Sequence, residues 1–348
     1  MLWEKAWAKL HGSYLRIEAG RVGNALGDIT GAPHVDVIWR DSGEGLGTGS
    51  LNLNATWDQL VAADKARLPM AAAMPEVKHK DMEEEWGLVE GHAYSILGTK
   101  LLAGGTIKMV ELRNPWGGGT EWKGKYSDNS NAWTEALKAE AKFEAKEDGR
   151  FHLEFSDFAL CFSEFCVLNL RAGWSRVNTS KFKVDPSGRA MTGIFKVKTP
   201  TQAFVSIHKR DLRQLEVGDT YGITRFEVFR LSDGTGQDVA GLEHVAAVDP
   251  SKRRDTNVAV DLAAGFFRVV VWGCFPGGKA RDCTLSIYSE HPIELGMVDG
   301  NEQICDVQLS EAYAEKCLRE GDAIDAGDRV TDAGIVVRLR HPCAPSFN

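Results

Sequence analysis

The sequence predicts an α+β fold, in which a mixed helical and stranded N-terminal half is followed by an antiparallel β-sandwich. In the first half, amphipathic helical patterns alternate with short apolar strand patterns. In the second half, strand-like runs recur at short spacing with Gly- and Pro-containing turns between them, as is typical of a sandwich. These runs are GIFKVKT, AFVSIHK, RFEVFRLS, NVAVDL, GFFRVVVWG and CTLSIYSE.

The composition argues against a nucleic-acid-binding protein and against a membrane-spanning protein. The 348 residues are 43% hydrophobic and 26% charged, which is ordinary for a globular protein of about two or three domains. The net charge of −8, with dispersed Lys and Arg, argues against nucleic acid as a partner. No run approaches the roughly 20 apolar residues of a transmembrane segment, and membrane association is not expected. The 7 scattered cysteines lack metal-ligand spacing and indicate reduced thiols in a cytoplasmic location.

The remaining elements of the first half follow in order. Residues 2–11 predict an amphipathic helix, and residues 20–31 and 43–50 predict Gly-rich loops. The segment ATWDQLVAADKARL predicts a helix, and residues 69–85 predict an alanine-rich and then charged connector. Residues 131–146 predict another helix, and HLEF and FCVLNL predict the closing strands.

A hairpin is predicted between these elements. AYSIL and IKMVEL alternate like strands, and LLAGG between them is a turn signal. A turn centred near Ala103 leaves a loop of about five residues. The expected cross-strand pairs are His92–Asn114, Tyr94–Leu112 and Ile96–Val110. This register makes one face apolar, as a half-buried hairpin requires, and brings His92 and Asn114 together at the open end.

A histidine facing an asparagine carbonyl oxygen has a chemical use. The oxygen accepts from one ring nitrogen and fixes the tautomer and the ring plane, so that the other nitrogen is aimed at a nucleophile. This is the base-and-orienter half of a Cys-His-Asn site. The residues alone leave a second interpretation open, in which His92 is a structural histidine beside a turn asparagine.

The motifs GLVEGHAYSILG and LRNPWG closely resemble the histidine and asparagine motifs of the calpain family of cysteine endopeptidases. Further similar segments occur in the family's order: LWEKAWAKLHGSY, ALGDITG, EWKGKYSDNSNAW and EDGRFHLEFSDFALCFSEFCVLNL. The resemblance covers roughly residues 2–170. It implies that His92 is the catalytic histidine, that Asn114 orients it, and that Trp116 shields their hydrogen bond from water.

The same resemblance implies a domain organisation. Residues 1–171 are expected to form a papain-like β-barrel lobe with flanking helices, the His/Asn half of the calpain catalytic core. Residues 174–290 are expected to form the calpain-type β-sandwich that follows the core, because QAFVSIHK and GFFRVVVWGCFPGGKARDCTLSIYSE resemble it. Residues 291–348 have a weaker pattern and are expected to begin another sandwich.

A calpain also needs a nucleophilic cysteine, which the family carries in a separate lobe ahead of the segment resembling LWEKAWAKL. None of the cysteines of this sequence precedes His92, and Cys161 and Cys166 lie in an apolar run typical of buried cysteines. The expectation is therefore a calcium-dependent protein endopeptidase present as a fragment without its nucleophile lobe and inactive alone. The alternative is a non-catalytic pseudo-peptidase that binds protein partners through the sandwich.

The resemblance also implies a calcium site. Its ligands would be the carboxylates of Glu121, Asp128 and Asp148 and the backbone carbonyl of Lys146, and calcium prefers such oxygen donors. Arg150 stands where many calpains have another acid, so the alternative is that these are solvated loop acids without calcium. No EF-hand pattern occurs, and the expected sandwich has no dense acidic run, so little calcium binding is expected there.

Overall fold

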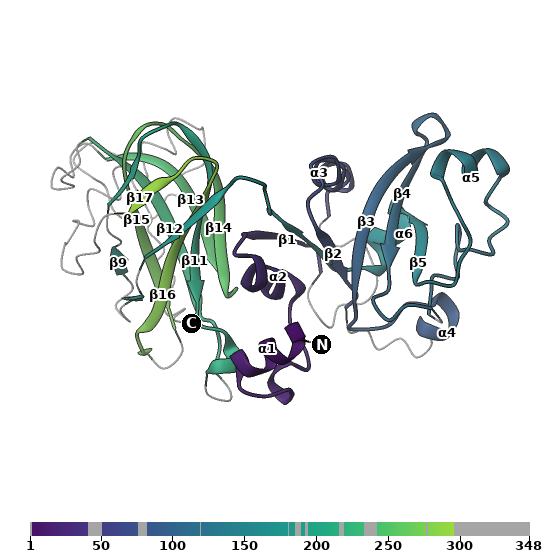
Figure 1. Cartoon of the computed structure of the whole chain (residues 1–348), viewed down its shortest axis with the longest axis horizontal. Helices are drawn as coiled ribbons and strands as arrows, with labels where there is room; N and C mark the ends of the chain where they lie inside the picture. The colour runs from purple at the N-terminus through teal and green to yellow at the C-terminus, as the bar shows by residue number, and fades with distance from the viewer. Residues whose placement is uncertain are drawn as a thin grey trace, which may run out of the picture. The chain divides into compact units, whose positions relative to one another are not determined.

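The computed structural model describes residues 2–40, 51–75, 82–118, 120–179, 181–184, 189–191, 194–215, 219–232, 242–275 and 278–295. The predicted loop at 43–50 and most of the predicted tail domain lie outside these residues. The chain is α+β, with helices and antiparallel sheets (Figure 1). It divides into two compact units. Gly20–Arg171 is called the His92 unit, and Met1–Ala19 together with the chain from Ala172 onward is called the two-sheet unit.

The His92 unit alternates short helices and strands. Its helices are α2 (Val22–Thr30), α3 (Leu53–Lys65), α4 (Met82–Trp86), α5 (Glu135–Ala141) and α6 (Phe155–Cys161), with a 3-10 turn at Ala103–Gly105. Its strands are β1 (His34–Ile38), β2 (Met70–Ala73), β3 (Ala93–Leu102), β4 (Ile107–Arg113), β5 (Arg150–Glu154) and β6 (Glu164–Leu168).

These strands form one antiparallel sheet in the order β1-β6-β2-β3-β4-β5. Among the described strands, β1 and β5 each pair on one side only, so the sheet is open and does not close into the expected barrel. The hairpin of β3 and β4 stands next to β5, and α3 packs beside β3 (Figure 1). This arrangement leaves the loop after β4 and the segment before β3 at the same end of the hairpin.

Buried aromatic and aliphatic side chains hold the sheet to its helices. Trp57 and Leu60 from α3, Phe158 from α6 and Tyr94 from β3 belong to one cluster of buried residues. Burying one such side chain contributes roughly 1.5–3 kcal/mol, so this core fixes the backbone on which the hairpin ends are built. Asp64 at the end of α3 accepts hydrogen bonds from the backbone and hydroxyl of Thr99, at 2.8 and 2.9 Å.

Two segments of the His92 unit differ from expectation. The predicted Gly-rich loop at 20–31 contains helix α2, whose Gly23 lies so close to the His34 ring that an added Cβ would come within 2.4 Å of it. The glycine therefore serves close packing on β1 and does not mark a loop. The predicted connector at 69–85 contains β2, which pairs with both β3 and β6. Alanine has a weak preference for strands, so this central strand follows from its pairing and not from its composition.

The two-sheet unit is built mostly of strands. They are β7 (Ser175–Asn178), β8 (Phe182–Val184), β9 (Arg189–Met191), β10 (Phe195–Val197), β11 (Thr201–Lys209), β12 (Ile223–Leu231), β13 (Glu243–Ser251), β14 (Asp255–Leu262), β15 (Gly265–Cys274), β16 (Arg281–Ser289) and β17 (Ile293–Leu295). Its helical elements are α1 (Leu2–His11) and the 3-10 turns Leu15–Ile17 and Leu212–Gln214.

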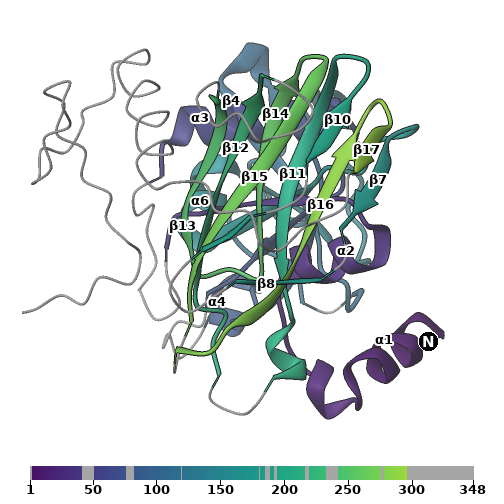
Figure 2. The same ribbon diagram turned by 90° about the vertical axis from the view of Figure 1, so that its left-hand side faces the viewer.

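One antiparallel sheet has the order β13-β12-β15-β10-β17, with β9 on β15, and the other has the order β14-β11-β16-β7, with β8 on β16. The strands β12 and β15 run side by side, as do β11 and β16 (Figure 2). Both sheets contribute to one cluster of buried residues, for example Val205 and Ile287 from one sheet and Val228 and Val269 from the other. Alternate residues of each strand thus share a common apolar core.

Helix α1 has the bounds that its pattern predicts, and it joins the two-sheet unit through the turn at Leu212–Gln214. Gln214 Nε2 donates to the Leu10 carbonyl at 3.5 Å, and Arg213 donates to the Ala19 carbonyl. Within the part of the chain that the structure describes, no helix is long and apolar enough to span a membrane.

Candidate active site

The hairpin register differs from the predicted one. The turn lies later, between Leu102 and Ile107, and a bulge interrupts the ladder between Ile96 and Gly98. Ile96 therefore pairs with Leu112 and not with Val110. The bulge lies where Gly98 closely approaches the Asp64 carboxylate, with 3.3 Å to a Cβ built at this position. Such local packing is invisible in the alternation of the sequence, although the apolar face of the hairpin is unchanged.

The His92 and Asn114 side chains nevertheless meet. Ser95 pairs with Arg113, so His92 and Asn114 are not directly opposite, and their side chains reach each other diagonally across the hairpin end. His92 Nε2 lies 3.0 Å from Asn114 Oδ1. His92 is half-buried, whereas Asn114 has no exposed surface. The pair therefore lies at the border between the core and the surface.

Backbone groups fix the orientation of the Asn114 amide. Its Nδ2 donates to the Thr120 carbonyl at 3.2 Å, and its Oδ1 accepts from the Trp116 backbone N–H at 3.1 Å. A carbonyl can only accept and a backbone N–H can only donate, so the amide cannot be flipped without breaking both bonds. Oδ1 is thus the atom that faces His92.

This orientation determines the tautomer of the histidine. Since Asn114 Oδ1 can only accept, His92 Nε2 must carry a hydrogen and donate it. In the neutral ring, Nδ1 is then the unprotonated nitrogen. No hydrogen bond engages Nδ1 among the residues that the structure describes. The geometry leaves one basic ring nitrogen available to an external proton donor.

Aromatic side chains hold the His92 ring on two sides. The Trp116 ring lies 4.4 Å from the His92 ring between centroids, tilted by 41°, and 62% of Trp116 remains exposed. The Tyr94 ring meets the His92 ring edge-on at 5.0 Å. Tyr94 is itself fixed, because it is buried and its hydroxyl accepts from the Val89 backbone N–H at 2.8 Å.

The turn that carries Asn114 depends on Gly149, the residue just before β5. The Asn114 N–H donates to the Gly149 carbonyl at 2.8 Å. Gly149 has a φ of +85°, and a Cβ there would lie 2.7 Å from the Asn114 carbonyl oxygen. Only glycine fits this conformation and this spacing. The sequence motif EDGR thereby positions a residue that lies far from it in the chain.

The predicted calcium ligands lie in the loops on either side of this turn. Glu121 accepts from the Gly149 N–H at 2.6 Å, Asp128 from the Lys146 N–H at 2.8 Å and Asp148 from the Arg150 N–H at 3.0 Å. The Lys146 carbonyl accepts from the Asp148 N–H at 2.9 Å. The Arg150 guanidinium lies 3.8 Å from Glu111, so it pairs with a residue of β4.

The surroundings of Glu121 and Asp128 disfavour the charged forms of their carboxyl groups. Burial raises the pKa of Glu121, and the neighbouring Asp128 and Asp148 raise it further. Burial also raises the pKa of Asp128, with a contribution from Asp148. Among the described residues, however, no group of three or more acidic, cysteine or histidine side chains forms a metal-binding set. In this arrangement the predicted ligands are bonded to backbone N–H groups and are not gathered around one point.

The described cysteines do not supply a nucleophile. Cys161, Cys166 and Cys283 are free and buried, and burial raises the pKa of each thiol to about 12. A cysteine acts as a nucleophile only as the thiolate, so these thiols are inert at neutral pH.

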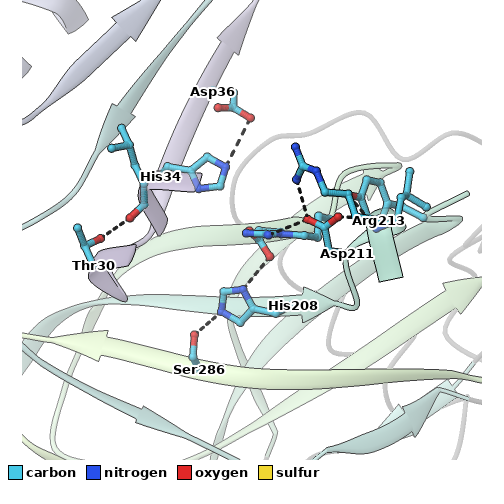
Figure 3. Close-up of polar contacts among 12 residues, drawn as sticks. Thr30, His34, Asp36, His208, Asp211, Arg213 and Ser286 are labelled. Carbon is cyan, nitrogen blue, oxygen red and sulfur yellow. Dashed lines mark hydrogen bonds and ion pairs between the residues drawn. The ribbon is translucent and has the colours of Figure 1, made fainter. Parts of the chain in front are cut away.

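A second histidine network lies in the two-sheet unit and was not predicted. His208 on β11 lies between Asp255 on β14 and Ser286 on β16 (Figure 3). Its Nδ1 is 2.8 Å from Asp255 Oδ1, and its Nε2 is 2.6 Å from Ser286 Oγ. Arg176 Nη2 lies 3.2 Å from the same Nε2. Ser286, His208 and Asp255 are thus linked in the same order as the residues of a Ser-His-Asp catalytic triad.

This second network does not have the surroundings of a catalytic site. Ser286 is 3% exposed and lies within β16, which is hydrogen-bonded to β11 on one side and to β7 on the other. A nucleophile needs access to substrate and donors free to hold an oxyanion. Arg176 also competes with Ser286 for the same ring nitrogen. We assign the network to the stability of the sheet.

The first half of the sequence decides the family. Residues 1–169 match the model of the calpain family cysteine proteases. This part of the chain belongs to the calpain family. A calpain-type cysteine protease, ADL1 of Oryza sativa subsp. japonica, is 36% identical over 165 residues, which are 47% of this chain and 7% of the rice protein. Human calpain-12 is 37% identical over 174 residues, 49% of this chain and 22% of that protein.

Mouse calpain-5 aligns over a longer range, with 26% identity over 341 residues that cover 83% of this chain and 51% of calpain-5. The chain thus spans about half of calpain-5 and a much smaller part of the plant relative. Among solved structures, a mitogen derived from Yersinia pseudotuberculosis covers 38% of this chain and 92% of its own, with 7% identity and a TM-score of 0.22, too low to support an argument.

The sequence did not predict the groups that fix the orientation of Asn114 toward His92. The Thr120 carbonyl and the Trp116 N–H are backbone atoms, so residue identity gives no signal for them. The Tyr94 hydroxyl was assigned only to packing, although it ties β3 to the segment before His92.

Proposed function

We propose that this chain supplies the histidine and asparagine of a calpain-type cysteine endopeptidase that acts on protein substrates. His92 is the general base, Asn114 is the positioning residue, and Trp116 shields their hydrogen bond from water. The observation that carries the proposal is the locked Asn114 amide, which presents Oδ1 to His92 Nε2 at 3.0 Å and leaves Nδ1 unprotonated.

The proposed chemistry uses both ring nitrogens. His92 Nδ1 takes the proton of a cysteine thiol, and the resulting thiolate attacks the carbonyl carbon of the scissile peptide bond. The imidazolium then carries a proton on each nitrogen. Its Nε2–H remains donated to Asn114 Oδ1, which stabilises the charged ring, and its Nδ1–H is passed to the leaving amine. The nucleophilic cysteine lies outside the described residues, since the described free thiols are buried and protonated.

The test is a chimera in which the nucleophile-bearing lobe of an active calpain is joined ahead of Met1. The chimera should cleave a protein substrate, whereas residues 1–348 alone should not. The matched control is the same chimera with its nucleophilic cysteine changed to alanine. A folded chimera that never cleaves, or one that cleaves without its cysteine, would contradict the proposed chemistry.

The two-sheet unit supports a further part of the proposal. Its two sheets share one core, and the alignment with mouse calpain-5 extends well beyond residue 169. We therefore propose that residues 174–290 form the calpain-type β-sandwich and that residues 1–171 correspond to the His/Asn lobe of the core. The free thiols of Cys161, Cys166 and Cys283 support a cytoplasmic location.

Calcium binding is a separate proposal. Burial is the main cause of the raised pKa values of Glu121 and Asp128, and the neighbouring acids add to it; a cation bound among these acids would offset that added repulsion. Each acid already accepts a backbone N–H, so calcium requires these loops to rearrange. Calcium, but not magnesium at the same concentration, should raise the melting temperature of the chain, and Asp128→Asn should remove this increase. An equal increase in the variant would exclude this loop as the site.

A further inference from the structure

The two-sheet unit contains a basic cavity. It has a volume of about 170 Å³ and is lined by residues from β8, β16, the end of β11 and the segment before β12. A water molecule takes about 30 Å³ of liquid volume, so the cavity can hold a small polyatomic group. Its charged lining residues are Lys183, Lys209, Arg210, Arg281 and Asp282.

Lys209 is the central feature of this cavity. Only 7% of the residue is exposed, and burial lowers the pKa of its ammonium group to about 8. Its Nζ donates to Thr224 Oγ1 at 2.9 Å and to the Gly222 carbonyl at 3.4 Å. The Nζ also lies 6.0 Å from the centroid of the Tyr221 ring. An ammonium group has three donors, so one donor has no oxygen acceptor among the described residues. No carboxylate lies within ion-pair distance of Lys209 among the described residues.

Burial of a charged group without an opposite charge is unfavourable. The other charges around the cavity do not correct this. Arg281 is paired with Asp219, and Lys183 and Arg210 have no ion pair within the described part of the chain. Among the lining residues that the structure describes, Asp282 is the single carboxylate, and it is exposed. The described lining therefore has three cations without an ion pair, Lys183, Lys209 and Arg210, beside this one acid.

We infer that this cavity binds a phosphate group, held by the buried Lys209 ammonium and by the Lys183 and Arg210 side chains. The ammonium would make a charge-assisted hydrogen bond to a phosphate oxygen, and the two exposed cations would neutralise the remaining charge. A phosphate group fits better than a carboxylate because it offers three or more acceptor oxygens to donors from different strands. The group can belong to free phosphate, to a soluble phosphomonoester or to a lipid headgroup.

The test uses the full chain in a phosphate-free buffer. Binding of inorganic phosphate and of glycerol phosphate is measured by isothermal titration calorimetry, with melting temperatures recorded in parallel. Lys209→Met removes the charge at nearly constant volume and should weaken binding by roughly tenfold or more, as the loss of a charge-assisted hydrogen bond predicts. Lys252→Met, a change at an exposed lysine that does not line the cavity, is the matched control and should bind like the unchanged chain.

Arg210→Gln serves as the second variant, because an exposed side chain can be changed without affecting folding; it decides the result if Lys209→Met does not fold. Vesicles carrying a phosphomonoester lipid distinguish the sources: Lys209-dependent binding to vesicles that exceeds binding of glycerol phosphate assigns the site to a lipid headgroup. The inference is overturned if the unchanged chain shows no saturable binding of any of these probes. It is equally overturned if the cavity variants bind as well as Lys252→Met.

Discussion

His92 in the His92 unit and His208 in the two-sheet unit each have a ring nitrogen close to a side-chain oxygen, at 3.0 and 2.8 Å. They differ in their other ring nitrogen. That of His92 has no hydrogen-bond partner among the described residues, whereas that of His208 is shared by Ser286 and Arg176. The distances of a triad are therefore not sufficient to make a histidine catalytic. A catalytic histidine also needs a nitrogen that is left open to a proton donor.

The largest expected effect concerns His92. In the active chimera, His92→Ala should lower turnover by at least ~10²–10⁴-fold, because the general base is lost. His208→Ala in the same chimera should leave turnover per folded molecule unchanged. Both are measured as cleavage of a protein substrate, with circular dichroism to confirm folding. Equal turnover in the folded His92→Ala chimera would make His92 a structural histidine and remove the contrast.

The next effect concerns stability in the second network. Asp255 accepts from His208 and from Arg254, and Asp255→Asn removes one of the two carboxylates, Asp255 and Asp211, that pair with the buried Arg254. The free energy of unfolding of the two-sheet unit should fall by about 1.5–3 kcal/mol at neutral pH, the range for a hydrogen bond to a charged group. The measurement is urea unfolding followed by fluorescence. A change below 1 kcal/mol would show that the network does not hold the sheet.

The same residue makes a prediction about pH. The hydrogen bond from His208 and the charges of His208 and Arg254 outweigh burial and hold the pKa of Asp255 well below its usual range. A depressed pKa stabilises the fold above the unfolded value, near pH 4, and this contribution is lost as the pH falls below it. Stability measured from neutral pH downward should therefore drop more steeply in the unchanged chain than in Asp255→Asn. If the stability of the two proteins falls equally with pH, the Asp255 carboxylate does not contribute the predicted stabilisation.

A smaller effect is expected from Asn114. Asn114→Ala in the chimera removes the acceptor for His92 Nε2 but leaves the base, so turnover should fall by roughly 10–100-fold, the value of one hydrogen bond to a charged group. Asn114→Asp is the matched variant. It keeps an oxygen toward His92 but loses the donor to the Thr120 carbonyl. Full activity of Asn114→Ala would show that the ring is oriented by Tyr94 and Trp116 alone.

The sequence was sufficient for features that depend on residue type in a local pattern. The alternation around Tyr94 predicted the hairpin and its apolar face, and the motifs around His92 and Asn114 predicted that the two residues would meet. The register was wrong, because the turn lies later than Ala103, with Leu102 paired to Ile107, and this moves every pair of the hairpin. Strand β2 and helix α2 were missed because each is fixed by contacts with β6, which is distant in the sequence.

The smallest effect, and the sharpest comparison, concerns Ser286. If the second network only stabilises the sheet, Ser286→Ala removes one buried hydrogen bond and should cost about 1 kcal/mol of unfolding free energy. Arg176 remains near His208 Nε2, so the ring keeps a partner and the loss stays small. Cleavage by the chimera should be unchanged, since turnover depends on His92 and on the cysteine of the added lobe.

The chimera whose nucleophilic cysteine has been replaced by alanine tests whether Ser286 itself can act as a nucleophile. If that chimera still hydrolyses a substrate and Ser286→Ala abolishes the hydrolysis, then Ser286 is a nucleophile despite its burial and the contrast between the two histidines fails. Absence of hydrolysis in both variants, with a small change in stability, confirms that a triad of correct distances without access and without a free nitrogen is structural.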